Sequence, residues 1–436
     1  MSHNDLLCNP HAHLARRTLL GAGVGGSMLS LLAGRLALAS ESGRSDPSRP
    51  KSVILLWLEG GPSQLETFDP HPGSRIGGDA KSVASSIKGL EICDTLSQTA
   101  ERMHLGSLVR SVTSKEGDHE RAVYNVKTGY RPDPTLVHPS IGSILCHEFP
   151  AELDIPRHVS ITPGGSPATG GYLGPVYDAF KMGDPQNPVP DLKSPVADER
   201  FAQRMKDLEM LEANFRRGRL RELDRTRTLH QPATEAALRM MTSDQVSAFD
   251  VSEEPASVRD AFGDTSFGRG CLAATRLIQA GVRCVEVTLG GWDSHVSNHT
   301  LQSSACETLD IALAALLSKL EEMDLLESTL VVCGGEFGRT PQINAADGRD
   351  HWPHGFSTFL AGCGIRRGGV FGETSSDPKL DPDKPMQDVS DPVSVADIHA
   401  TILHALDVDF EHELDTPVGR PLKRSEGSPI KEILAS

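Results

Sequence analysis

The chain has 436 residues and a formal net charge of −16, because 59 Asp and Glu outnumber 43 Lys and Arg. This negative balance argues against a nucleic-acid-binding protein, which needs a basic face for phosphate groups. Hydrophobic residues at 38% and charged residues at 23% are usual for a folded globular protein and exclude a wholly disordered chain. The eight cysteines form no CxxC pair, which excludes a zinc ribbon, and we expect them to be buried apolar residues.

The N-terminal segment 1–39 has the pattern of an export signal. Paired Arg16 and Arg17 precede a Gly-rich apolar stretch, and Ala-Leu-Ala at 37–39 offers a small-residue cleavage site. The adjacent arginines indicate a twin-arginine signal, which carries folded proteins across a bacterial inner membrane. A retained membrane anchor is the alternative, but the glycines make this stretch a poor bilayer span. We therefore expect a periplasmic or secreted protein with a polar linker at 40–50 and no membrane span after cleavage.

The remainder, 51–436, alternates apolar runs with helical patterns. The apolar runs, typical of buried strands, cover 52–58, 105–112, 283–289 and 328–335. Helical periodicity covers 267–280, with Ser266 as the predicted cap, and then 304–323 and 394–406. A Gly- and Pro-rich loop followed by a charged helical stretch forms an insertion at about 162–262. These patterns predict an α/β fold, a three-layer sandwich with a mostly parallel central sheet and a helical insertion.

Polar residues come directly after the predicted strands, at the sheet edge where α/β proteins bind ligands. The loop 59–70 after the first strand carries Glu59, Glu66 and Asp69. Carboxylates at a strand end suit a hard divalent cation. The alternative is that such residues only form the turn.

The second strand is followed by a charged run that contains His119 and Arg121. A charged turn is the alternative to a site here. The third strand is followed by Asp293, His295 and His299, and mixed imidazole and carboxylate ligation suits Zn, Mn or Fe.

The fourth strand is followed by Glu336 and Arg339, and then by His351 and His354. A carboxylate at this position is costly to bury unless it is paired or metal-bound, and Arg339 is a candidate partner or oxyanion clamp. Four clusters after four strands are best explained by one shared site at one sheet edge.

Five motifs resemble those of a known family: GGPSQLETFDP, HERAVYNVKTGY, GGWDSH, TLVVCGGEFGRTP and GRDHWP. They resemble the DUF1501 family of exported bacterial proteins, which are common in planctomycetes, and the resemblance spans about residues 50 to 425. That family looks like a branch of the alkaline phosphatase, sulfatase and phosphoglycerate mutase superfamily. The resemblance implies an alkaline phosphatase-like sandwich over 51–436 that hydrolyses phosphate or sulfate esters.

The resemblance also implies a site for divalent metal ions, which could be Zn, Mn, Fe, Ca or Mg. Two ions about 4 Å apart could clamp the attacking and leaving oxygens of an ester. The implied ligands of the first ion are Asp293, His295 or His299, and His351. The implied ligands of the second ion are Glu336 and a carboxylate of the first loop, namely Glu59, Glu66 or Asp69.

The sequence departs from the superfamily pattern at two places. The usual Asp-His pair after the last strand is Glu336-Phe337 here. The nucleophile position, nine residues before Thr128-Gly129, is His119 instead of Ser, Thr or Cys. We expect His119 to be a metal ligand or a general base, with a structural helix-capping role as the alternative.

These patterns lead to one functional hypothesis and two alternatives. The hypothesis is an exported metal-dependent hydrolase of anionic phosphate or sulfate esters, including glycan esters, in which Arg339 and Arg121 help to attract the substrate. The first alternative is a non-catalytic metal-binding envelope protein that recognises a glycan or protein partner. The second, a purely structural envelope protein, leaves the histidine clusters unexplained.

Overall fold

The computed structural model describes residues 51–165, 168–216, 230–381 and 383–435. The expected export signal at 1–39 and the linker at 40–50 lie outside the described residues, as does part of the predicted insertion. None of the helices within the described ranges is long and apolar enough to cross a membrane.

The centre of the fold is a mixed sheet, which contains nine strands among the described residues. They are β1 (Ser52–Leu58), β4 (Gly106–Thr113), β5 (His158–Ile161), β6 (Phe180–Met182), β7 (Cys284–Leu289), β8 (Thr329–Gly334), β11 (Phe356–Gly362), β12 (Gly369–Phe371) and β15 (Val393–Ser394). Their order is β12-β4-β11-β8-β1-β7-β5-β6, with β15 also paired to β4. Every pair is parallel except the two that β11 makes. The predicted mostly parallel sheet is therefore confirmed.

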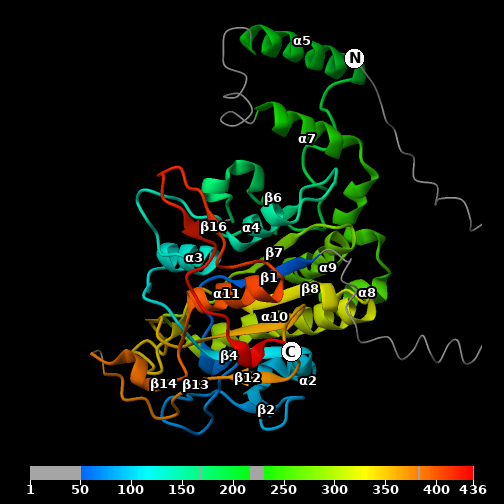
Figure 1. The fold of residues 1–436 in the computed structure, drawn as a ribbon. Coiled ribbons are helices and arrows are strands. Elements are labelled where there is room, and N and C mark those ends of the chain that lie inside the picture. The colour runs from blue at the N-terminus through cyan, green and yellow to red at the C-terminus, as the bar shows by residue number, and fades with distance from the viewer. Residues whose placement is uncertain (1–50, 166–167, 217–229, 382, 436) are drawn as a thin grey trace, which may run out of the picture. The chain divides into compact units, whose positions relative to one another are not determined.

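The described residues also include short ribbons and nine α-helices. The ribbons pair β2 (Ser82–Ala84) with β3 (Glu91–Cys93), β9 (Gly338–Arg339) with β10 (His351–Trp352), β13 (Glu373–Thr374) with β14 (Val389–Ser390), and β16 (Glu413–Leu414) with β17 (Leu422–Lys423). The helices are α2 (Ser97–Arg102), α3 (His119–Thr128), α4 (Ile141–Glu148), α5 (Asp198–Arg216), α7 (His230–Thr242), α8 (Ala256–Ala261), α9 (Ser266–Gln279), α10 (Asn298–Glu322) and α11 (Val395–Ala405) (Figure 1).

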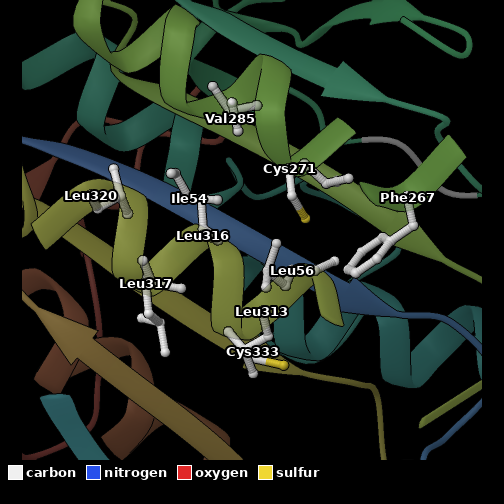
Figure 2. Close-up of a cluster of buried hydrophobic side chains, with 14 of the residues drawn as sticks. Ile54, Leu56, Phe267, Cys271, Val285, Leu313, Leu316, Leu317, Leu320 and Cys333 are labelled. Carbon is white, nitrogen blue, oxygen red and sulfur yellow. The ribbon is translucent and has the colours of Figure 1, made fainter. Parts of the chain in front are cut away.

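The first strand is apolar from residue 53 to its end at residue 58, as expected for a strand that is covered on both faces of the sheet. Ile54 and Leu56 point to one side and pack with residues of α9 and α10, among them Phe267 and Leu313 (Figure 2). Val53 alternates to the other side and packs with residues of α4 and α11. Two helical layers enclose one sheet, which confirms the predicted three-layer α/β sandwich.

Two predicted helix starts differ from the structure. The cap of α9 is Thr265, whose side chain accepts from the N–H of Gly268, and Ser266 is the first helical residue. Helix α10 begins at Asn298, six residues before the predicted start. Its first turns bury polar side chains, such as Gln302, which donates to the carbonyl of Trp292 at 2.9 Å. The apolar periodicity that predicts a helix is therefore absent from those turns.

Helix α11, Val395–Ala405, begins and ends within one residue of the predicted helix over 394–406. The side chain of Ser394 accepts from the N–H of Asp397, whose carboxylate in turn accepts from the N–H of Ser394. This reciprocal capping box satisfies two donors at the helix start. All seven cysteines of the described residues are buried and free, as predicted; Cys8 lies outside these ranges.

Candidate metal centre

Four segments bring polar side chains to one edge of the sheet. Strands β8, β1 and β7 are neighbours in that order, and their carboxyl ends lead to Glu336, Gly60 and Asp293 respectively. His119 is the first residue of α3, which comes after β4, so the charged run that contains His119 and Arg121 begins a helix. His351 lies on β10, directly opposite Arg339 on β9.

Three side chains could share one metal ion. One ligand atom each of His119, Asp293 and His351 lies within 4.8 Å of the others. Nε2 of His119 is 3.4 Å from Oδ2 of Asp293, and Nε2 of His351 is 3.5 Å from Oδ1 of the same carboxylate. The structure therefore brings together residues that lie far apart in the sequence. Whether they bind a metal stays a prediction.

Glu336 binds the ring of His119 and orients it. Its side chain is fully buried, and Oε1 accepts from Nδ1 of His119 at 2.8 Å and from the N–H of Gly60 at 2.9 Å. The other oxygen, Oε2, and Nε2 of His119 are buried and have no hydrogen-bond partner. Because buried polar atoms are rarely left unpaired, these two atoms suggest a missing ligand. Imidazole nitrogen and carboxylate oxygen are donors that suit a divalent transition metal ion, so the residues fit such an ion.

His295 lies at the rim of the cluster. Its Nε2 is 3.2 Å from Oδ1 of Asp293 and 3.0 Å from Nε2 of His351. Its Nδ1 lies 2.8 Å from Oδ1 of Asp350. Asp350 is not among the residues predicted from the sequence, although it directly precedes His351 in the GRDHWP motif.

Arg339 is fully buried and orients Asp293. Its Nη2 donates to Oδ1 of Asp293 at 2.7 Å, and its Nε donates to the carbonyl of Gly61 at 2.9 Å. Another guanidinium N–H donates to the carbonyl of Arg349 at 3.1 Å. Because these donors bind protein atoms, Arg339 is the partner of Asp293 instead of an open clamp for an oxyanion.

The pKa directions of Asp293 and His351 suit metal binding, whereas the raised pKa of His119 favours the protonated ring, which cannot bind a metal ion. Burial raises the pKa of Asp293, but the hydrogen bond and the charge of Arg339 outweigh burial and hold it below its usual range. Burial lowers the pKa of His351, which favours the neutral imidazole that ligates metals. The hydrogen bond to Glu336 raises the pKa of His119, against the opposing effect of burial.

The structure does not bring the first-loop carboxylates to this cluster. Both buried carboxylates are engaged elsewhere: Glu66 accepts from Nε and Nη2 of Arg349 at 3.1 and 3.0 Å, and Asp69 accepts from Nη1 of Arg110 at 2.8 Å. Glu59 accepts from the N–H of Gly165 at 3.0 Å. Glu66 and Asp69 thus pair with arginines away from the cluster, and a second metal site with a first-loop carboxylate stays a prediction.

Two further candidates also lie outside the cluster. Arg121 donates to Glu116 at 2.6 and 3.0 Å through Nε and Nη2. His299 lies in the first turn of α10, and its Nδ1 is buried without a partner. No interaction among the described residues joins either side chain to Asp293 or His351.

Comparison with solved structures finds low sequence identity over most of the chain. A protein in the alkaline phosphatase superfamily from Vibrio parahaemolyticus is 12% identical, with 94% of this chain and 80% of that chain covered and a TM-score of 0.39. The lipoteichoic acid synthase LtaP from Listeria monocytogenes is 11% identical, with 90% of this chain and 79% of that chain covered and a TM-score of 0.40. The PsFucS1 sulfatase from Pseudoalteromonas sp. is 13% identical, with 86% of this chain and 70% of that chain covered and a TM-score of 0.34.

No curated protein matches the sequence. Residues 50–434, which include every residue of the cluster, match the model of a family described as "Protein of unknown function (DUF1501)". The match covers nearly the whole described chain, so this protein belongs to the DUF1501 family.

Proposed function

We propose that this protein is an exported metal-dependent hydrolase that acts on phosphate or sulfate esters. The observation that carries the proposal is the convergence of His119, Asp293 and His351 beside the unpaired, buried oxygen of Glu336. Mixed donors at the carboxyl edge of a parallel sheet are a usual setting for catalysis. Export rests on the sequence pattern of residues 1–39.

Each residue of the centre has a separate task in this proposal. A divalent ion held by His119, Asp293 and His351 would supply Lewis acidity that polarises the ester and activates water. Arg339 keeps Asp293 ionised and oriented. Glu336 fixes the ring of His119 through Nδ1, so that Nε2 faces Asp293.

His295 and Asp350 could move a proton. Asp350 accepts from Nδ1 of His295, which leaves Nε2 facing the cluster. The side chain of His295 is 45% exposed, so a substrate can reach it. An imidazole oriented by a carboxylate is a common general acid or base, and here it could protonate the departing alcohol.

Water is the proposed attacking group. No serine, threonine or cysteine side chain takes part in the interactions that join the described residues of the cluster. The position that resembles the superfamily nucleophile is His119, and its Nδ1 already binds Glu336. A side-chain hydroxyl is therefore not part of the proposed mechanism.

The test combines metal analysis with an ester panel. Protein purified from the periplasm should contain a divalent transition metal and hydrolyse an aryl phosphate or an aryl sulfate, and a chelator should abolish turnover. Asp293→Ala and His351→Ala should lose the metal and retain the fold, whereas His412→Ala, at an exposed histidine, should change neither property. Wild-type metal content in both cluster variants would refute the centre. Bound metal without turnover of any ester would instead favour the non-catalytic metal-binding alternative.

A further inference from the structure

One fully buried aromatic side chain lies outside the hydrophobic core. Phe337 directly follows Glu336, past the carboxyl end of β8, and its exposed fraction is 0%. It belongs to neither of the two clusters of buried apolar residues that the described part of the chain contains. A phenylalanine usually stabilises a protein by packing among other apolar side chains, so its burial at this place needs a separate explanation.

The rings beside Phe337 belong to two residues of the candidate metal centre. The centroid of the Phe337 ring lies 5.0 Å from that of His119 and 4.4 Å from that of His351. The two imidazoles are themselves 4.4 Å apart and nearly perpendicular, with an interplanar angle of 76°. At these distances all three rings are in contact, so Phe337 packs against both histidines of the centre.

Hydrogen bonds at Nδ1 restrain the two imidazoles but do not fix their planes. Nδ1 of His119 lies 2.8 Å from Oε1 of Glu336, and Nδ1 of His351 lies 2.8 Å from the carbonyl of Gly117. A histidine ring can still tilt about such a bond, because the torsion angle that turns the ring has a broad energy minimum. A metal site requires its ligands to be oriented within about 10–20°. Contact with a third ring limits this tilt.

The ring of Phe337 is itself held in place. A Cβ atom at Gly61 would lie 2.6 Å from Cε2 and 2.7 Å from Cδ2 of Phe337, so the ring lies directly against the backbone of the turn after β1. The guanidinium carbon of Arg339 is 5.8 Å from the ring centroid, and that buried guanidinium donates to Asp293. A tight turn and a hydrogen-bonded side chain therefore prevent the Phe337 ring from moving away.

We propose that Phe337 is a positioning residue that fixes the ring planes of His119 and His351, so that Nε2 of each faces Asp293. Its side chain has no donor or acceptor, so it acts only through the two imidazoles. The consequence for ester hydrolysis rests on the proposed function, whereas the ring packing is a property of the metal-free protein. The alternative is that Phe337 only stabilises the fold, as a phenylalanine of the core does.

The first measurement uses the full-length protein, labelled with ¹⁵N at its histidines, after a chelator has removed metal ions. NMR spectroscopy gives the rates at which the Nδ1 protons of His119 and His351 exchange with water. Phe337→Leu keeps an apolar side chain but removes the ring. It should increase both exchange rates about tenfold, because rings that have lost an aromatic contact break their Nδ1 hydrogen bonds more often. Phe337→Met replaces it if the leucine variant does not fold.

Two further variants separate ring position from stability. Phe337→Tyr keeps the planar ring and should retain the slow exchange of the wild type. Phe267→Leu is the matched control, because Phe267 is also fully buried but belongs to a core cluster, on α9. This control should lose stability in urea denaturation without faster exchange at His119 or His351.

The second measurement is calorimetric titration of the same proteins with Zn²⁺ alone. Phe337→Leu should bind Zn²⁺ about tenfold more weakly than the wild type, because residues that orient metal ligands typically have effects of this size. Phe337→Tyr and Phe267→Leu should bind Zn²⁺ like the wild type.

The outcomes distinguish this inference from the proposed function. Unchanged Nδ1 exchange in Phe337→Leu, an equal change in Phe267→Leu, or Zn²⁺ affinity in Phe337→Leu equal to that of a Zn²⁺-binding wild type would overturn the positioning role. None of these results contradicts ester hydrolysis by the wild type. Faster exchange in Phe337→Leu alone, beside a wild type that neither binds Zn²⁺ nor hydrolyses any ester, would support the positioning role and refute the hydrolase.

Discussion

At the scale of single residues, the buried carboxylates differ in role: some belong to the candidate site, and others stabilise the fold. Glu336 and Glu66 are both buried after apolar segments, yet their partners differ. Glu336 binds a histidine and a backbone N–H and retains an unpaired oxygen, whereas Glu66 is paired with the buried guanidinium of Arg349. The hydrogen-bond partner of a buried carboxylate therefore indicates its role better than its burial does.

This difference predicts opposite results for two equivalent substitutions. Glu336→Gln should lower metal affinity about 10- to 100-fold, because it weakens the group that orients His119, and should leave the fold intact. Glu66→Gln should lower the free energy of unfolding by about 3–5 kcal/mol, because it leaves Arg349 buried without a counter-charge, and should spare metal affinity. Metal titration and urea denaturation measure the two effects. Equal metal affinity in the two variants would contradict the assignment.

At the scale of elements, the turn after β1 packs against the turn after β7. Gly60 has a φ of +117°, and its N–H binds Glu336. A Cβ atom at this position would lie 2.6 Å from the backbone nitrogen of Asp293. The close approach of two backbones at the candidate metal centre therefore requires glycine here.

Gly60→Ala should consequently reduce both stability and metal content. Gly73→Ala is the control, because Gly73 also has a positive φ, of +73°, but its Cβ would meet nothing within 4 Å. The control should lose only the stability that left-handed strain accounts for, about 1 kcal/mol, and should bind metal normally. Metal analysis of both variants distinguishes a steric effect at the site from general strain. Normal metal content in Gly60→Ala would show that the two turns can move apart.

The contact between α11 and α3 introduces a pH-sensitive group. His399 on α11 is buried, and its Nε2 lies 2.6 Å from the carbonyl of Val126 on α3. Burial lowers the pKa of His399 from 6.5 to about 4. Below about pH 6.5 the unfolded chain takes up a proton at this residue, whereas the folded protein does so only below about pH 4.

The free energy of unfolding should therefore fall as the pH drops from about 6.5 to about 4. The contribution of His399 is roughly 3 kcal/mol, which corresponds to the size of its pKa shift. His399→Gln keeps a donor for Val126 but cannot titrate, so its stability should depend less steeply on pH within this window. Urea denaturation at several pH values measures the slope. An equal slope in the variant and the wild type would assign the acid sensitivity to other groups.

At the scale of the whole molecule, export and folding are linked through the proposed signal at 1–39. The twin-arginine route carries folded proteins, so the metal centre could be assembled before the chain leaves the cytoplasm.

We expect the exported protein to begin near Ser40. Replacing both Arg16 and Arg17 by lysine should retain the precursor in the cytoplasm, because the twin-arginine receptor requires the arginine pair. Mass spectrometry of the periplasmic form tests the cleavage site, and cell fractionation tests the double variant. An intact N-terminus or unchanged export would contradict the twin-arginine assignment.

The sequence by itself predicted four strands of the sheet and several residues of the candidate centre. All four apolar runs are strands of the sheet, because a strand buried on both faces must be continuously apolar. His119, Asp293, Glu336 and His351 come together because each comes after a strand or lies just beyond one. The antiparallel β11 was not predicted, since its Ser357 and Thr358 interrupt the apolar run although both are buried.

Only the tertiary structure decided which carboxylate meets which cation. Asp69 and Arg110 belong to different strands and loops, and Glu66 and Arg349 are separated by 283 residues, so no local pattern relates them. Once packing buries such an arginine, a carboxylate from a distant segment must neutralise it, and the place of that pair in the fold decides whether the carboxylate lies at the candidate centre, as Asp293 does, or away from it, as Glu66 does. Local sequence determines where a strand ends and which polar residues come after it, whereas the pairing of buried charges depends on contacts between distant segments.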